Sequence, residues 1–286
     1  MTGRRHRDGG GLGSARGLRE PLAGDYNSRM FGFFRSRRRR KLLAEPFPSW
    51  WDAILARNVG HFPLLSAPEQ AMLRDITRIL IVEKGWEGCG GLHVTDEIKV
   101  TVAALAALLL IGFDDHDFFA RVPSVVVYPS DFRTPQAEDD WEDDELSDRV
   151  IDGQAVYRGP VILSWDHVLT ESRDPACGYN VVVHEFAHQL DFLDGEQNGT
   201  PPLGSPEAEA NWVRVMSAAL TEHRKEAGRS RPTFLSEQAA DDETEFFADC
   251  AEAFFCNPHG LGDEYPAVFE LLAGYFRQDP RRWFGG

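Results

Sequence analysis

Residues 181–191 read Val-Val-Val-His-Glu-Phe-Ala-His-Gln-Leu-Asp, which places the pattern His-Glu-x-x-His inside an apolar run. Residues i and i+4 of an α-helix lie on one face, so His184 and His188 can both reach one metal ion. Glu185 lies one residue further round the helix, beside the open position of such a metal, where it can take a proton from water. Two histidine ligands and a glutamate base are typical of zinc metallopeptidases.

The alternative to a metal site is an ordinary amphipathic helix whose histidines are packed or exposed. The flanking residues argue against it, because they are apolar around most of the helix and would bury both imidazoles and the carboxylate. Burying such groups without a partner is costly. The sequence therefore favours a helix that binds a single zinc ion per chain.

A catalytic zinc ion needs a third protein ligand, and the sequence leaves two routes open. In the first route the ligand follows closely, as in His-Glu-x-x-His-x-x-Gly-x-x-ligand. This spacing puts Asp191 at the glycine position and Asp194 at the ligand position. Asp191 makes the required sharp turn less readily than glycine does.

In the second route the ligand comes from a later helix, predicted over residues 243–255. Glu245, Asp249 and Glu252 fall at i, i+4 and i+7, a carboxylate stripe on an otherwise apolar helix. Aligned carboxylates repel one another unless a cation lies nearby. We therefore favour Glu245 over Asp194 as the third ligand. We expect Asp249 to accept the N–H of a ligating imidazole, with Glu252 as a further acid near the ligands.

Charge is unevenly distributed along the 286 residues, which carry a net charge of −16. Residues 1–41 contain twelve basic and three acidic side chains, a net charge of +9, which leaves −25 on the remainder. An acidic body argues against nucleic-acid binding. The composition predicts that residues 1–41 form a disordered basic tail and that residues 42–286 form a single domain. Met30, within the tail, is a candidate for the true translational start.

Cysteine spacing and hydropathy indicate a cytoplasmic protein. The four cysteines lack the spacing of disulfide frameworks or zinc fingers, which suggests a reducing compartment. The longest apolar run, Val100–Phe113, is too short to span a bilayer. The N-terminus has no apolar segment of the kind found in signal peptides.

Periodicity and capping residues predict an α+β fold, dominated by helices and with a small β-sheet. Beyond the two helices discussed above, the main predicted helices cover residues 67–84 after a capping box at Ser66, 95–110, 206–227 and 265–276, and a short one lies within 46–65. The predicted strands cover residues 122–128 and a hairpin of 150–157 with 159–165, whereas 85–91 is a break and 131–148 an acidic loop. Val161–Trp165 is either an edge strand that binds extended peptide or an ordinary core strand, and we expect His167 in the loop after it.

Several collinear segments over about residues 46–280 resemble the Mlc titration factor A family of bacterial zinc peptidases, and the catalytic region resembles the anthrax lethal factor metalloprotease domain. The matching segments are 126–129, 140–144, 159–165, 178–191, 245–248 and 252–255. The resemblance implies a gluzincin-like fold with zinc held by His184, His188 and Glu245. It also implies that Glu185 is the base, that Asp191 belongs to the motif, and that the activity is peptidase or aminopeptidase.

Two functions follow from these expectations. The first is a zinc-dependent peptidase that hydrolyses peptide bonds, with an aminopeptidase-like mode as one option. The second is a non-catalytic regulator, because enterobacterial members of the family also bind a glucose-related transcriptional repressor. An intact Glu185 favours the enzyme, since a purely structural zinc site has no need of a base.

One position departs from the family pattern. Members carry a tyrosine seven residues before the third-ligand glutamate, where this chain has Gln238. A tyrosine hydroxyl suits the stabilisation of a developing oxyanion. Gln238 can donate through its amide, and His223 could substitute if the fold brings it close.

Overall fold

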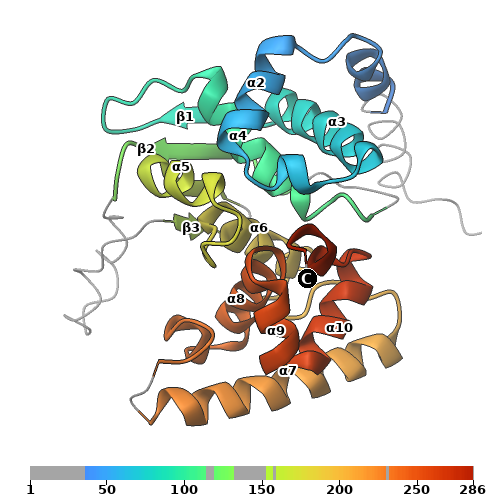
Figure 1. Ribbon diagram of the computed structural model, residues 1–286, viewed down its shortest axis with the longest axis vertical. Coiled ribbons are helices and arrows are strands. Elements are labelled where there is room, and N and C mark those ends of the chain that lie inside the picture. The colour runs from blue at the N-terminus through green and yellow to red at the C-terminus, as the bar shows by residue number, and fades with distance from the viewer. Residues whose placement is uncertain (1–35, 114–118, 132–152, 157–158, 230–231, 286) are drawn as a thin grey trace, which may run out of the picture. The chain divides into compact units, whose positions relative to one another are not determined.

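Helices surround one small sheet, so the α+β class predicted from the sequence is confirmed (Figure 1). This computed structural model divides the chain into a unit of residues 1–44 and a unit of residues 45–286. It describes residues 36–113, 119–131, 153–156, 159–229 and 232–285. No helix within these ranges is long and apolar enough to cross a membrane.

The described part of the first unit is helical over residues 36–43. Disorder predicted as far as residue 41 is therefore wrong for residues 36–41. Arginine, lysine and leucine, which dominate this segment, are all good helix formers. Met30 and the rest of the predicted tail lie outside the described residues.

Within the second unit, three helical segments precede the sheet: α2 (Ser49–Asn58), η1 (Phe62–Leu64) and α3 (Ala67–Glu83). The predicted capping box is present at the start of α3, where the Ser66 backbone N–H donates to Glu69 Oε2 at 2.8 Å. This reciprocal cap satisfies donors that the first helical turn leaves unpaired.

The sheet has the spatial order β1-β2-β4-β3. Its strands are β1 (Gly85–Gly88), β2 (Ser124–Tyr128), β3 (Gly153–Ala155) and β4 (Val161–Ser164). β1, β2 and β4 run parallel, and β3 is antiparallel to β4. The helix α4 (Asp96–Leu108) makes the crossover between β1 and β2 that parallel pairing requires.

Three predictions about this region need correction. The expected break at 85–91 contains β1, which its glycines concealed but which pairs with β2. The candidate edge strand is β4, yet it lies between β2 and β3 and cannot accept a further strand. The edge position on this side of the sheet belongs to β3, and β1 forms the opposite edge. His167, expected in a loop, lies on the helix α5 (Trp165–Arg173), where its Nε2 is 2.7 Å from Asp131 Oδ1.

Residues 132–148 of the predicted acidic loop lie outside the described residues.

The remaining helices build the part of the fold that carries the metal-binding pattern. They are α6 (Val181–Asp191), α7 (Pro206–Ala227), η2 (Gln238–Ala240), α8 (Glu243–Cys256), α9 (Pro258–Glu264) and α10 (Pro266–Phe276). α6 packs against both α4 and α8, and α7 runs beneath α9 and α10 (Figure 1). α4, with its near-continuous apolar run, is buried and supports α6 from one side.

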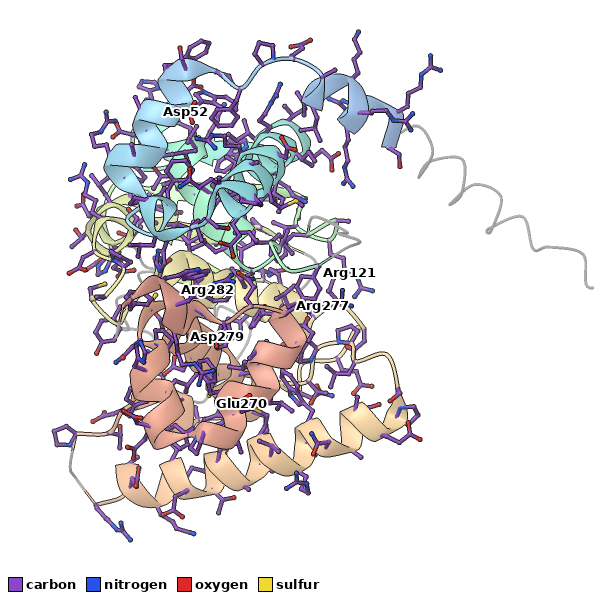
Figure 2. The ribbon with its side chains drawn as sticks, turned by 45° about the vertical axis from the view of Figure 1, so that its right-hand side comes forward. Asp52, Arg121, Glu270, Arg277, Asp279 and Arg282 are labelled. Carbon is purple, nitrogen blue, oxygen red and sulfur yellow. The ribbon has the colours of Figure 1, made fainter. Side chains whose placement is uncertain are left out.

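The C-terminal segment closes the core on the side of α3. η3 (Pro280–Trp283) is capped by Asp279, and Arg282 forms an ion pair with Glu69. Asp279 and Arg282 are labelled in Figure 2. Trp283 is buried and stacks on Phe255 of α8, with ring centroids 6.1 Å apart. This packing ties α8 to the end of the chain.

Candidate metal centre

Both ends of α6 are fixed by specific contacts. At its start, the Asn180 side chain accepts from Val183 N at 3.1 Å. The backbone N–H of Asn180 donates to Glu252, and that of Val181 donates to Glu171 Oε2 at 2.7 Å. These contacts satisfy donors that a helix N-terminus otherwise leaves open. The helix that carries the histidines is therefore held in position from α5 and α8.

The end of α6 is anchored by Arg121 and Asp191. Arg121 Nη1 donates to Phe192 O at 2.6 Å, close to the C-terminus of the helix (Figure 2). Asp191 is fully buried and accepts from Thr200 N at 2.8 Å, which ties the following loop back to the helix. Burial raises the pKa of Asp191 to about 6. Asp191 thus contacts the loop at 199–200 rather than an imidazole.

Three candidate ligands converge: His184 and His188 from α6, and Glu245 from the first turn of α8. The Nε2 atoms of His184 and His188 are 3.2 Å apart. Glu245 Oε2 lies 3.4 Å from His184 Nε2, and Glu245 Oε1 lies 3.5 Å from His188 Nε2. The ligand atoms around a tetrahedral zinc ion, at bond lengths of about 2.0–2.1 Å, are about 3.3 Å apart. The two Nε2 atoms, and each Nε2 with one Glu245 oxygen, are therefore at distances compatible with a shared tetrahedral metal ion.

The other nitrogen of His184 faces two further acids of α8. Asp249 Oδ1 lies 3.3 Å from His184 Nδ1, and Glu252 Oε2 lies 3.5 Å from it. Burial alone would lower the pKa of His184, but Asp249, Glu245 and Glu252 raise it well above the ordinary value. The stripe of three carboxylates predicted on this helix thus faces one imidazole.

His188 is held differently. Its ring stacks on Phe192 at 6.0 Å, and its buried Nδ1 has no hydrogen-bond partner among the described residues. Burial lowers the pKa of His188 well below the ordinary value, and positive charge on His184 lowers it further. A neutral His188 beside His184 presents the unprotonated nitrogen that a metal ion requires.

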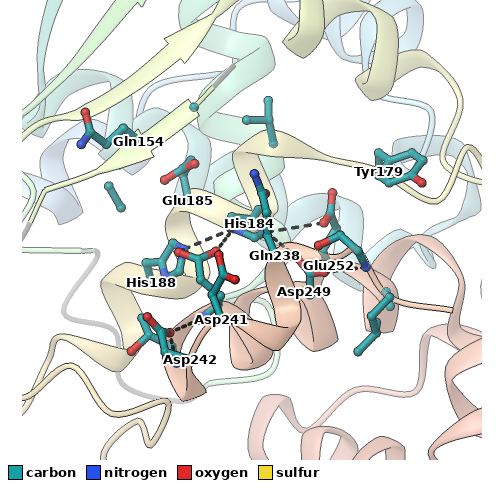
Figure 3. A pocket seen from close by; sticks show the side chains of 18 of the residues that line it. Gln154, Tyr179, His184, Glu185, His188, Gln238, Asp241, Asp242, Asp249 and Glu252 are labelled. Atoms are coloured by element: carbon teal, nitrogen blue, oxygen red, sulfur yellow. Dashed lines mark hydrogen bonds and ion pairs between the residues drawn. The ribbon is translucent and has the colours of Figure 1, made fainter. Parts of the chain in front are cut away.

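A cleft of about 950 Å³ contains this group of residues (Figure 3). Its size lies at the upper end of the roughly 300–1,000 Å³ found for ligand sites. Its described lining has no lysine or arginine and includes these acidic residues: Glu171, Glu185, Asp241, Asp242, Glu243, Glu245, Asp249 and Glu252. The cleft therefore favours cationic groups.

Glu185 projects from α6 into this cleft beside the edge strand β3 (Figure 3). Gly153 of β3 lies so close that a Cβ atom there would meet both Val181 and Glu185. Gly153, Gln154 and Ala155 all line the cleft, whereas no residue of β4 does. The strand beside the metal group is therefore β3.

Of the other candidate residues from the sequence, one lines the cleft and two do not. Asp194 is outside the cleft lining, and its Oδ1 accepts from Glu196 N at 2.9 Å. Gln238 lines the cleft from η2 (Figure 3). His223 is fully buried behind that segment, with its Nε2 3.0 Å from Ser236 O, so it does not reach the cleft. Tyr179, to which the sequence analysis assigned no role, also lines the cleft (Figure 3).

Three contributors to the site escaped the sequence analysis. Glu171 supports the start of α6 from a helix that was not predicted. Gly153 allows β3 to approach Glu185, and a glycine within a strand pattern was an available signal of such an approach. The Ser236 backbone N–H donates to Asp249 Oδ2 at 3.0 Å, and a backbone donor leaves no trace in the sequence.

A helix with His-Glu-x-x-His, joined by a glutamate from a second helix, defines the metallopeptidase class of site. The chain belongs to the family of glucose-regulated metallo-peptidase M90, whose family model matches residues 33–277. It is 30% identical over 256 residues to Mlc titration factor A of Yersinia pestis (strain Pestoides F), a match covering 85% of this chain and 90% of that protein. An uncharacterized protein of Synechocystis sp. is 29% identical over 245 residues, with 85% and 89% covered. The resemblance to the Mlc titration factor A family is thereby confirmed, whereas the resemblance to the anthrax lethal factor metalloprotease domain stays a prediction.

Proposed function

We propose that the protein is a zinc-dependent peptidase, with His184, His188 and Glu245 as the ligands. The observation that supports this most directly is that the two Nε2 atoms lie 3.2 Å apart and that each has a Glu245 carboxylate oxygen 3.4–3.5 Å away. Glutamate and two imidazoles form a donor set that zinc accepts while keeping one position open. When bound, zinc would supply Lewis acidity and lower the pKa of a water molecule.

In this proposal Glu185 is the general base. It takes a proton from the attacking water and later delivers it to the leaving amine. Asp249 accepts the Nδ1 proton of His184, which leaves Nε2 free to bind the metal and fixes the orientation of the ring. The distance of 3.3 Å between His184 Nδ1 and Asp249 Oδ1 supports this role. Glu252 adds negative charge on the same side and also holds the start of α6.

The substrate is a peptide that lies in the cleft alongside β3. The acidic lining suits an aminopeptidase-like mode, because a carboxylate such as Asp241 can bind the α-ammonium group of a peptide. Peptides with a free amino terminus should then be cleaved faster than their N-acetylated counterparts.

Zinc analysis together with turnover of a peptide library tests this function. The parent protein should hold about one equivalent of zinc and cleave peptides. Glu185→Gln preserves the size of the side chain and should keep zinc but lose nearly all hydrolysis. Glu209→Gln, on the exposed face of α7, is the matched control and should behave as the parent. Equal rates for Glu185→Gln and the parent would show that the mechanism is wrong.

The alternative is a regulator that binds a transcriptional repressor. It is favoured by the name Mlc titration factor A carried by relatives that match 85% of this chain. Binding of Mlc purified from one of those organisms, measured with the parent and with Glu185→Gln, separates the two functions. Tight binding by both proteins, with no peptide cleaved by either, would favour the regulator.

A further inference from the structure

The C-terminal end of α7 holds both ends of a short segment that reaches the metal group. This segment, residues 236–241, contains η2 and carries Gln238 into the cleft. His223 Nε2 lies 3.0 Å from Ser236 O at the start of the segment. Arg224 Nε and Nη2 donate to the carbonyl oxygens of Ala240 and Asp241 at 2.8 and 3.0 Å, at its end.

The tautomer of His223 follows from its partners. A carbonyl oxygen can only accept, so Nε2 carries the proton and donates to Ser236 O. Nδ1 is then an acceptor, and Tyr265 OH lies 3.4 Å from it. Burial raises the pKa of Tyr265, so the hydroxyl keeps its proton and can donate. The ring of His223 also packs against Phe246, with centroids 6.0 Å apart. His223 is therefore fixed on two sides.

The segment is in turn connected to a proposed metal ligand. Ser236 N donates to Asp249 Oδ2 at 3.0 Å, while the other oxygen of Asp249 faces His184 Nδ1 at 3.3 Å. Ser236 Oγ also accepts from Ala239 N at 3.2 Å, which closes the turn into η2. A displacement of residues 236–241 would therefore remove a hydrogen bond that orients Asp249.

We infer that His223 and Arg224 are positioning residues that clamp segment 236–241 against the metal group. They touch neither the ligands nor the cleft, and they act through Ser236 and Asp249 on the orientation of His184. The inference rests on the metal site proposed above. Because partners of ligating imidazoles typically change metal affinity by about 10–100-fold, a more remote clamp should act at the lower end of this range.

Two variants and two controls test the clamp. Arg224→Met removes the donors but keeps the aliphatic stem, and Arg214→Met is its control, since Arg214 lies on the same helix and contacts Asn211. His223→Phe keeps an aromatic ring but removes the donor. His223→Gln keeps an amide donor and should restore much of the parent behaviour.

The measurements are amide hydrogen exchange across residues 236–241 and the zinc dissociation constant by competition with a chelator. Arg224→Met and His223→Phe should speed exchange in this segment and raise the zinc dissociation constant about tenfold. Arg214→Met should change neither. Unchanged exchange in both clamp variants would overturn the inference, and faster exchange with unchanged zinc affinity would overturn its link to His184. Absence of zinc binding in the parent protein would instead refute the metal assignment, and exchange would still test the clamp.

Discussion

Gly153 of β3 lies against Glu185 of α6, so closely that a Cβ atom on Gly153 would come within 2.6 Å of Glu185 Oε1. Such an atom would also lie 2.5 Å from a methyl group of Val181. The absence of a side chain at Gly153 therefore sets the distance between the edge strand and the proposed base. This relationship fixes one wall of the cleft.

Gly153→Ala should impair hydrolysis without removing zinc. The added methyl group must displace Glu185 or the strand, and a misplacement of about 1 Å can cost roughly 10²-fold in rate. Zinc content should persist, because the three atoms nearest to the added one belong to Val181 and Glu185 and not to a proposed ligand. Steady-state kinetics and metal analysis check this, with Gly204→Ala as the control, since a Cβ there meets nothing within 4 Å. Parent-like rates for Gly153→Ala would mean that Glu185 needs no such fixed position.

Replacement of the third ligand should remove the metal. Glu245→Ala should lose most of its zinc, because two imidazoles alone bind zinc much more weakly than a three-ligand site. Asp194→Ala should keep its zinc, since Asp194 lies outside the cleft and caps a turn at Glu196. Metal content of the purified variants is the measurement. Loss of zinc from Asp194→Ala alone would move the third ligand to the first of the two routes seen in the sequence.

Acid should destabilise the fold partly through His61. This ring is fully buried, with its Nε2 3.1 Å from Phe255 O, and burial lowers its pKa from 6.5 to about 4. The unfolded chain therefore binds this proton below pH 6.5 and the folded chain only below about pH 4. Stability from neutral His61 is complete above pH 6.5 and is lost as the pH falls towards 4, by about 3 kcal/mol in all.

Urea unfolding between pH 7 and pH 4 measures this loss. His61→Gln should lose less stability over that range than the parent protein, because its amide does not titrate. His259→Gln is the control, since His259 is exposed but also lies near a backbone carbonyl, 3.2 Å from Arg281 O. Identical pH dependence of the unfolding free energy in His61→Gln and the parent would contradict the assignment.

Much of the helical framework could be predicted from the sequence, because strong local signals mark it. The capping box at Ser66 and the periodicity of residues 206–227 define helices close to those observed. The stripe of Glu245, Asp249 and Glu252 could also be predicted, since its helical spacing places all three on one face.

The strand order could not be predicted in the same way. Four residues of β1 include two glycines, and only their pairing with β2 makes them a strand. Val161–Ser164 looks the same in sequence whether it lies inside the sheet or at its edge. β3, which has only three residues, lies at the edge beside β4. The strand that forms the wall of the cleft is therefore decided by long-range pairing.

Gln238 is the position at which this chain departs from the family pattern, and we expect the departure to lower the rate of hydrolysis. It lines the cleft from η2, where a donor could stabilise negative charge on the scissile carbonyl (Figure 3). Loss of one such donor typically costs roughly 10²–10³ in rate. Because a glutamine amide is shorter and more flexible than a tyrosine, Gln238→Tyr should raise kcat on a small peptide and leave zinc content unchanged. Gln197→Tyr, at another glutamine of the same cleft, is the control. If Gln238→Tyr fails to raise kcat, Gln238 either already donates to the carbonyl oxygen or does not act at the site. Gln238→Ala distinguishes these cases, because it lowers kcat only if Gln238 already donates.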